Sequence, residues 1–256
     1  MRRWRDRRPL KSWRYIGAYG PELMLCAGDA RIGPLRQRFW AVATPDGRLR
    51  EKTTLFGTGG VWMTDAELAI DGRGVRARLR VDRDDVERVE TLSRHGDSYI
   101  WTGKQGGVRI GGLVELDGRP IQFDAGGVVD DSAGYHARHT VWSWSAGVGA
   151  LTDGRPVAWN LVAGVHDAPE ASERTIWIEG RPAEAGPVTF ASNLTGISGS
   201  GVALSFTAWS TREDRTNALL VKSHYEQPFG TFKGKLADDL TLAEGYGVME
   251  SHDVWW

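Results

Sequence analysis

The segment IDGRGVRARLRV, residues 70–81, contains the pattern that decides the fold. It begins with an Asp-Gly turn, and in the run VRARLRV at residues 75–81 apolar side chains alternate with arginines. Strict alternation places the apolar side chains on one face of a β-strand and the arginines on the other. The segment therefore predicts a half-buried strand that follows a tight turn.

The same combination of turn and alternation recurs along the chain. Asp-Gly or Glu-Gly turns followed by arginine begin at Pro45, Leu116, Thr152 and Ile178, and the run GVALSFTAWS at residues 201–210 also alternates. Glycine occurs 33 times in 256 residues and breaks most windows of helical length. The usual length of a strand plus a turn gives about 15–17 strands. We predict an all-β fold class with little helix, as two antiparallel β-barrels or half-barrels packed together or as one long folded meander.

A glycine- and aspartate-rich joint, GGVVDDSAG at residues 126–134, separates the first half from a tryptophan-rich second half. We expect an N-terminal β domain over residues 1–128, which carries a basic arm. We expect a C-terminal β domain over residues 129–256, which carries a tryptophan-rich site. We expect the site in this second half, built from the hairpin of residues 134–160 and the terminal strand, because aromatic and polar side chains mix there.

Composition and charge limit the classes of binding partner and the cellular compartment that we expect. A formal net charge of -1 gives no reason to expect a nucleic acid as partner. The one cysteine, Cys26, excludes an intrachain disulfide framework. The basic start MRRWRDRRPLKSWRY has no apolar run after it, so we expect a cytoplasmic protein. We expect the arm to pack onto the body of the protein, and membrane contact through it stays an open alternative. Oligomeric state does not follow from the sequence.

The stretch ARHTVWSWS at residues 137–145 alternates in an unusual way. As a strand it puts Arg138, Trp142 and Trp144 on one face, where a guanidinium can stack on indole rings, and His139 on the other. In the following run VAWNLVAG, Trp159 faces one side, and Asn160 lies among apolar neighbours on the other. A buried amide needs hydrogen-bond partners. Asn160 is therefore either a structural amide or a ligand contact.

The C-terminal stretch GYGVMESHDVWW places Glu250 and His252 on one face of a strand. Burial would raise the pKa of the carboxyl, and pairing would raise that of the imidazole. A structural ion pair, an acid–base pair and the start of a metal site all remain open, and our expectation is no metal. We expect the two side chains to face the interior near Arg138 or His139, hydrogen-bonded to one another or to residues 134–164.

Several motifs together resemble a known family. They are WRDRRPLKSWRY, VVDDSAGYHARHTVWSWSAGVG, GRPVAWNLVAGVHD, ERTIWIEG, YEQPFGTFKG and GYGVMESHDVWW. The sequence is identified as a member of the uncharacterised bacterial family 2804 of the domains of unknown function. It is more distantly similar to the paired-lipocalin proteins: the AttH-like group, carotenoid 1,2-hydratase, tocopherol cyclase and certain fungal Diels–Alderases. This resemblance implies two lipocalin-like barrels and ligands that are long and apolar, in several cases with acid-catalysed hydration or cyclisation and no cofactor.

Cation-forming chemistry needs an acid and aromatic faces that stabilise a carbocation. Asp130, Asp131 and Glu250 offer acids, and His136, His139 and His252 offer relays. Our candidate catalytic residues are Glu250, His252, Asp131 and His139. Our candidate ligand-binding residues are Tyr135, Arg138, Trp142, Trp144, Trp159 and Asn160.

We therefore expect a protein that binds a hydrophobic small molecule of the terpenoid, polyene or lipid class without a cofactor. The catalytic interpretation is acid-catalysed hydration, cyclisation or isomerisation. The alternative is a non-catalytic lipid-binding or carrier protein. A buried carboxyl that faces the cavity, with a raised pKa, would favour the first interpretation.

Overall fold

The structure, a computed structural model, describes residues 4–5, 8–55, 57–95, 97–217 and 222–256. Within these ranges the chain forms 21 β-strands and no helix, which confirms the all-β fold class. The count exceeds the expected 15–17 because seven of the strands are only two to four residues long. No helix in the described ranges is therefore long and apolar enough to cross a membrane.

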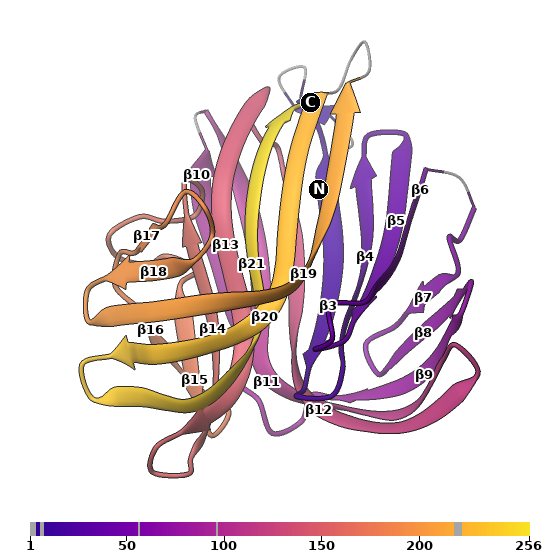
Figure 1. The fold of residues 1–256 in the computed structure, drawn as a ribbon. Coiled ribbons are helices and arrows are strands. Elements are labelled where there is room, and N and C mark those ends of the chain that lie inside the picture. Colours follow the sequence, from indigo (N-terminus) through magenta and orange to yellow (C-terminus); the bar gives the residue numbers. More distant parts are fainter. Residues whose placement is uncertain (1–3, 6–7, 56, 96, 218–221) are drawn as a thin grey trace.

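Nearly all strands belong to two antiparallel sheets (Figure 1). The first sheet runs in the order β6 (Leu49–Thr54), β5 (Leu35–Ala43), β4 (Met24–Ile32), β3 (Lys11–Tyr19), β12 (Arg119–Gly134), β11 (Ser98–Leu116), β9 (Val75–Asp82), β8 (Glu67–Gly72) and β7 (Val61–Met63), with β10 (Val89–His95) also paired to β11. The second runs in the order β16 (Arg181–Glu184), β15 (Thr175–Ile178), β14 (Pro156–Ala163), β13 (His139–Leu151), β21 (Leu240–Trp255), β20 (Lys222–Ala237), β19 (Val202–Asn217), β18 (Gly196–Gly199) and β17 (Thr189–Phe190). A small hairpin of β1 (Trp4–Arg5) and β2 (Arg8–Pro9) precedes them.

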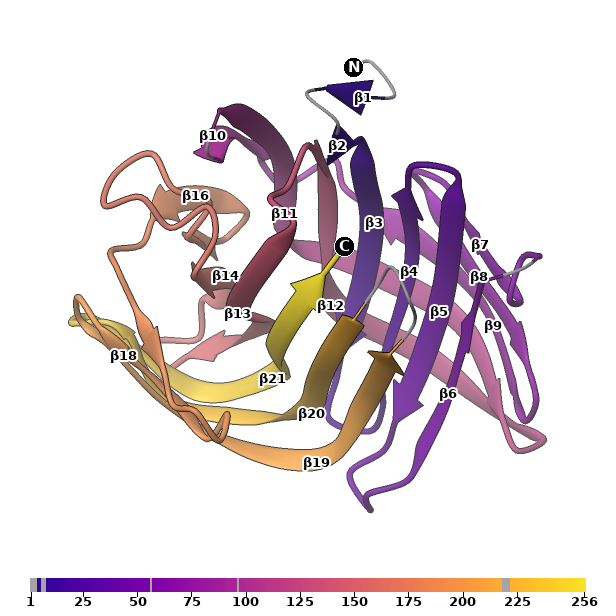
Figure 2. The same cartoon turned by 90° about the horizontal axis from the view of Figure 1, so that it is seen from above.

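Each sheet curls into a half-barrel, so the molecule has a paired lipocalin-like fold (Figure 2). Strand β9 shows how the sequence produces it: residues 75–82 alternate strictly between buried and exposed, as the quoted segment predicts. The chain passes from the first sheet to the second between Gly134 and His139. Strand β12 crosses the predicted boundary at residue 128 and lies wholly in the first sheet. The division into two domains stays a prediction.

Three apolar cores hold the fold together. One fills the curl of the first sheet around Leu25 and Ile110, and another fills the curl of the second around Leu161 and Phe232. The third contains residues of both sheets, among them Met24 and Val128 of the first and Ala146 and Val248 of the second, and it joins the two half-barrels. Burial of apolar area contributes roughly 25 cal/mol per Å². The third core therefore favours a fixed pairing of the two sheets.

Candidate functional site

A cavity of about 570 Å³ lies between the two half-barrels. The first sheet and the segment after it line it with Lys11, Trp13, Tyr15, Phe39, Lys104, Asp130 and His136; the second sheet and the chain end line it with Trp142, Trp144, Tyr225, Glu250, His252 and Trp256. The cavity therefore takes part of its lining from the predicted hairpin and terminal strand of the C-terminal half, and the rest from the first half. The curl of the second sheet is filled by its own apolar core.

Strand register brings part of the predicted site together. In the β13–β21 pair, Trp142 lies opposite His252 and Trp144 lies opposite Glu250. Directly opposed residues point to the same face of a sheet. All four side chains line the cavity, as the alternation of each stretch predicts.

Glu250 is a buried carboxyl that is held by uncharged donors. The indole Nε1 of Trp142 donates to its Oε1 at 2.8 Å, and the Tyr225 hydroxyl and the Gln227 amide donate to its Oε2 at 2.9 and 3.1 Å. No ion pair between described residues includes Glu250. Burial raises its pKa and the negative charge of Asp130 adds to that rise, whereas the donors from Trp142 and Tyr225 and the cation of Arg212 oppose it. The net effect is a carboxyl that holds its proton more tightly than an exposed glutamate.

His252 faces the same cavity but is not hydrogen-bonded to Glu250. Its Nε2 lies 2.8 Å from the Ser223 hydroxyl, and its ring packs against Trp142 with the centroids 4.4 Å apart. Burial, with the nearby Arg212 cation, lowers its pKa to about 3. The expectation that pairing raises this pKa is wrong, because the expected partner bonds elsewhere. At neutral pH the imidazole is uncharged.

Asp130 and Asp131 are neighbours in β12 and point to opposite faces of the sheet, as the pleat of a strand requires. Asp130 lines the cavity, whereas Asp131 accepts hydrogen bonds from Arg14 and Arg88 on the far face. Our choice of Asp131 as a catalytic residue is therefore corrected. Because neighbouring residues of a strand point to opposite faces, only one of the two carboxyls can line the cavity, and it is that of Asp130.

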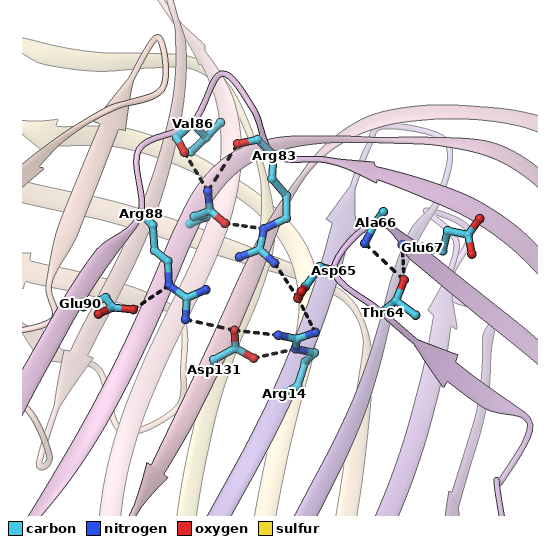
Figure 3. A network of polar contacts seen from close by, with 11 residues as sticks. Arg14, Thr64, Asp65, Ala66, Glu67, Arg83, Val86, Arg88, Glu90 and Asp131 are labelled. Carbon is cyan, nitrogen blue, oxygen red and sulfur yellow. Dashed lines mark hydrogen bonds and ion pairs between the residues drawn. The ribbon is translucent and has the colours of Figure 1, made fainter.

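Figure 3 shows that Asp131 belongs to a polar network. Its Oδ1 accepts from Arg14 Nε at 2.7 Å, and Arg14 also pairs with Asp65 at 2.8 Å. Arg83 pairs with the same Asp65 at 3.3 Å. These contacts join β3, β12 and the segments on either side of β8 and β9, so the carboxylate of Asp131 is a structural group.

A second cluster at the cavity combines two carboxylates with the ammonium group of Lys104. Lys104 Nζ lies 2.6 Å from Asp130 Oδ2 and 3.3 Å from Glu173 Oε1, and all three side chains are buried. Burial, together with the neighbouring Glu173, raises the pKa of Asp130 to about 6, although Lys104 opposes the rise. Burial would lower the pKa of Lys104, but its two carboxylate partners outweigh burial and raise it.

Two predicted residues lie at the surface. Arg138 is exposed and precedes β13, so the alternation of that strand does not extend to it. His139 is exposed, its Nε2 lies 2.7 Å from Asp253 Oδ1, and its ring stacks on Trp255. Neither residue lines the cavity. The expectation that Glu250 and His252 meet Arg138 or His139 inside is corrected, whereas the expected hydrogen bond from Glu250 to residues 134–164 exists through Trp142.

Three further predicted ligand contacts are buried in protein. Trp159 belongs to the core of the second half-barrel, where its ring covers Gly147 so closely that a Cβ there would lie 2.2 Å from it. Asn160 accepts from Trp144 Nε1 at 2.7 Å and donates to the Glu173 carbonyl at 2.8 Å, which makes it a structural amide. Tyr135 packs edge-on against Tyr99. None of the three lines the cavity, because each side chain packs against neighbouring protein groups.

Sequence reasoning missed several residues of the cavity. Lys104 lies directly opposite the candidate acid Asp130 in the β11–β12 pair, but 26 positions separate the two in the sequence and no local pattern reveals that register. Glu173 lies in the segment between β14 and β15, where no periodicity points to it. Arg212, buried beside Tyr225, sits in a run of charged residues that is typical of a solvated strand. No group of three metal-binding side chains occurs among the described residues.

The chain belongs to the family described as a domain of unknown function, DUF2804, whose model matches residues 60–256. Its fold is similar to that of an AttH-like protein of Nitrosomonas europaea, at 12% identity and a TM-score of 0.60 over 94% of this chain and 92% of that one. It is also similar to kievitone hydratase of Nectria haematococca, at 10% identity and a TM-score of 0.58 over 96% and 88%. No curated protein matches the sequence. The family and the AttH-like resemblance are thus confirmed, and at these identities the likeness concerns the fold.

Proposed function

We propose that this member of the DUF2804 family binds an apolar, unsaturated small molecule of the terpenoid, polyene or lipid class between its half-barrels, and that Glu250 protonates it. The observation that carries the proposal is a cavity of about 570 Å³ that contains a buried carboxyl without a cationic partner among the described residues. Ligand sites of small molecules typically measure about 300–1,000 Å³.

The lining supports an apolar ligand. Four tryptophans, Trp13, Trp142, Trp144 and Trp256, contribute to it, together with Tyr15 and Phe39. Aromatic walls with a few fixed polar groups are typical of such sites. Two of the carboxyls here are already bound within the protein: Glu250 accepts from Trp142 and Tyr225, and Asp130 is ion-paired with Lys104. The aromatic walls therefore supply most of the contacts that an apolar molecule would make.

The chemistry follows from Glu250 and its aromatic neighbours. The protonated carboxyl transfers its proton to one carbon of an alkene, and the electron pair of the double bond forms the new C–H bond. The positive charge that develops on the adjacent carbon lies among electron-rich ring faces such as those of Trp142 and Trp144. Addition of water and loss of a proton to Glu250 completes hydration, and loss of a proton from carbon completes isomerisation. Both routes return the carboxyl to its starting state.

A fluorescence titration tests the binding part of the proposal. All-trans-retinol, a polyene alcohol, serves as the probe, and energy transfer from tryptophan to retinol reports its proximity. We expect saturable transfer that is reduced in Trp142→Phe. The matched control is Trp62→Phe in β7, because Trp62 is exposed and outside the cavity. Equal transfer in both variants, or none in the wild type, would overturn the proposed site.

A deuterium experiment tests the catalytic part. The unsaturated alcohol geranylgeraniol is incubated with the protein in deuterated water, so that protonation of a double bond leaves deuterium on carbon. We expect incorporation by the wild type, loss of it in Glu250→Gln, and retention in the control Glu244→Gln, since Glu244 is an exposed residue of the same strand. Retinol binding without incorporation in the wild type would instead identify a carrier.

A further inference from the structure

Two lysines line the cavity, and their surroundings differ. Lys104 is 4% exposed and is bound to two carboxylates. Lys11 is 1% exposed, yet no ion pair between described residues includes it. Its Nζ donates to the carbonyl oxygen of His136 at 3.2 Å and lies 4.6 Å from the ring centre of Trp256. A buried amine beside a carbonyl and an indole lacks the negative charge that normally keeps an ammonium protonated.

The electrostatics of the two amines differ accordingly. Burial, together with the cations of Arg8 and Arg138, lowers the pKa of Lys11 to about 7. The carboxylates around Lys104 raise its pKa against the effect of burial. Near neutral pH a large fraction of Lys11 is thus the free amine, whereas Lys104 stays an ammonium. A free amine in an apolar cavity is the form that attacks carbonyl carbons.

We propose that Lys11 captures an apolar aldehyde in this cavity as an imine. The inference deepens the proposed function and rests on it, since it names a reactive head group for the same apolar ligand. The nitrogen lone pair attacks the carbonyl carbon and forms a C–N bond. The carbonyl oxygen then takes up two protons, in net terms the two that the amine loses, and leaves as water. A C=N bond remains, and no oxidant or reductant takes part.

The position of Lys11 also indicates the shape of the ligand. Its amine lies against Trp256. Upstream of Trp256 in the sequence, Val254, His252 and Glu250 also line the cavity. The rings of Trp256 and His252 lie 6.3 Å apart, and the ring of His252 lies 4.4 Å from that of Trp142, whose indole donates to Glu250. A molecule attached to Lys11 must therefore extend past these rings to bring a double bond to Glu250. This geometry favours an unsaturated aldehyde of polyene length over a compact one.

The probe for the test is all-trans-retinal, an apolar conjugated aldehyde. The wild-type protein is incubated with it at neutral pH, the imine is reduced with borohydride to a stable secondary amine, and the modified residue is identified by peptide mass spectrometry. We expect one retinyl group per chain, on Lys11, with at least about tenfold less on Lys104 because a paired ammonium is not nucleophilic. Lys11→Met should abolish the modification, and the exposed control Lys52→Met should retain it.

Retinol, which has no carbonyl group, separates the two proposals. Retinol binding without retinal modification of Lys11 would overturn the inference and leave the proposed binding function intact. Absence of both would overturn both. Modification spread evenly over the surface lysines would also overturn the inference. This outcome is measured by peptide mass spectrometry of the wild-type protein, so the test holds even if Lys11→Met fails to fold.

Discussion

The cavity contains two buried acidic groups that are balanced in different ways. On β11 and β12, Asp130 is paired with the ammonium of Lys104, which also binds Glu173. On β21, Glu250 is held by uncharged donors from Trp142, Tyr225 and Gln227. A buried ionic group is costly to break, whereas a carboxyl among neutral donors can gain or lose a proton without leaving a cation unpaired. We therefore assign a structural role to the ionic group around Lys104 and a role in proton transfer to Glu250.

The largest expected effect tests the ionic group. Lys104→Met leaves two carboxyls buried without their cation and should lower the free energy of unfolding by about 3–5 kcal/mol. Chemical denaturation measures this loss, and Lys233→Met, at an exposed position of β20, is the control, with a change within about 0.5 kcal/mol. A loss in Lys104→Met no larger than in this control would remove the structural role.

Acid should destabilise the protein through His252. Its pKa lies at about 3 in the folded state against the ordinary 6.5, so the unfolded state binds more protons between these values and stability falls as pH drops through 6.5. Between about pH 6.5 and pH 4.5 the loss is about 2–3 kcal/mol. The raised pKa of Asp130 acts in the opposite sense. The comparison is therefore the wild type against His252→Asn, whose acid loss should be smaller, with the exposed His139→Asn as control.

A smaller effect on stability, without an effect on retinol binding, should distinguish Asp131 from the cavity-lining Asp130. Asp131→Asn removes the charge that Arg14 and Arg88 share and should cost about 1–3 kcal/mol, since hydrogen bonds to charged groups contribute that much. Retinol binding should be unchanged, because Asp131 faces away from the cavity. A denaturation curve and a retinol titration of the same variant check both parts. Weakened retinol binding in a folded variant would contradict the assignment of faces.

The smallest expected effect on stability belongs to Glu250→Gln. The amide oxygen still accepts from Trp142, and no cation loses its partner, so the free energy of unfolding should change by less than about 1 kcal/mol. Deuterium incorporation should nevertheless be abolished. A loss comparable to that of Lys104→Met would show that Glu250 is structural and would erase the contrast between the two groups.

Local sequence pattern predicts the strands and their faces. The alternation of residues 75–81 and the Asp-Gly turns predict the β-hairpins, and the same reasoning places Trp142, Glu250 and His252 on cavity-facing sides. The alternation does not distinguish Asp130 from Asp131. It assigns the two residues to opposite faces of a strand but does not say which face lines the cavity. That choice depends on how two sheets pack, which is a long-range property.

Two other failures have the same physical origin. Trp144 and Trp159 both lie in alternating strands, yet one lines the cavity and the other fills the second half-barrel. The pairing of Lys104 with Asp130 depends on the register of β11 and β12, and Glu173 reaches them from a segment without regular structure. Composition and periodicity contain no information on such contacts between distant residues.

An infrared pH titration of the carboxyl C=O stretch tests the contrast between the two acidic groups most directly. Difference spectra between the wild type and Glu250→Gln isolate one carboxyl, and spectra against Asp130→Asn isolate the other. We predict that the Glu250 band titrates above the ordinary 4.5, and that the Asp130 band titrates near 6. In Lys104→Met the Asp130 value should rise further, because a cation that opposes protonation is lost. A Glu250 band that titrates at or below 4.5 would contradict the claim that this carboxyl is the proton donor of the cavity.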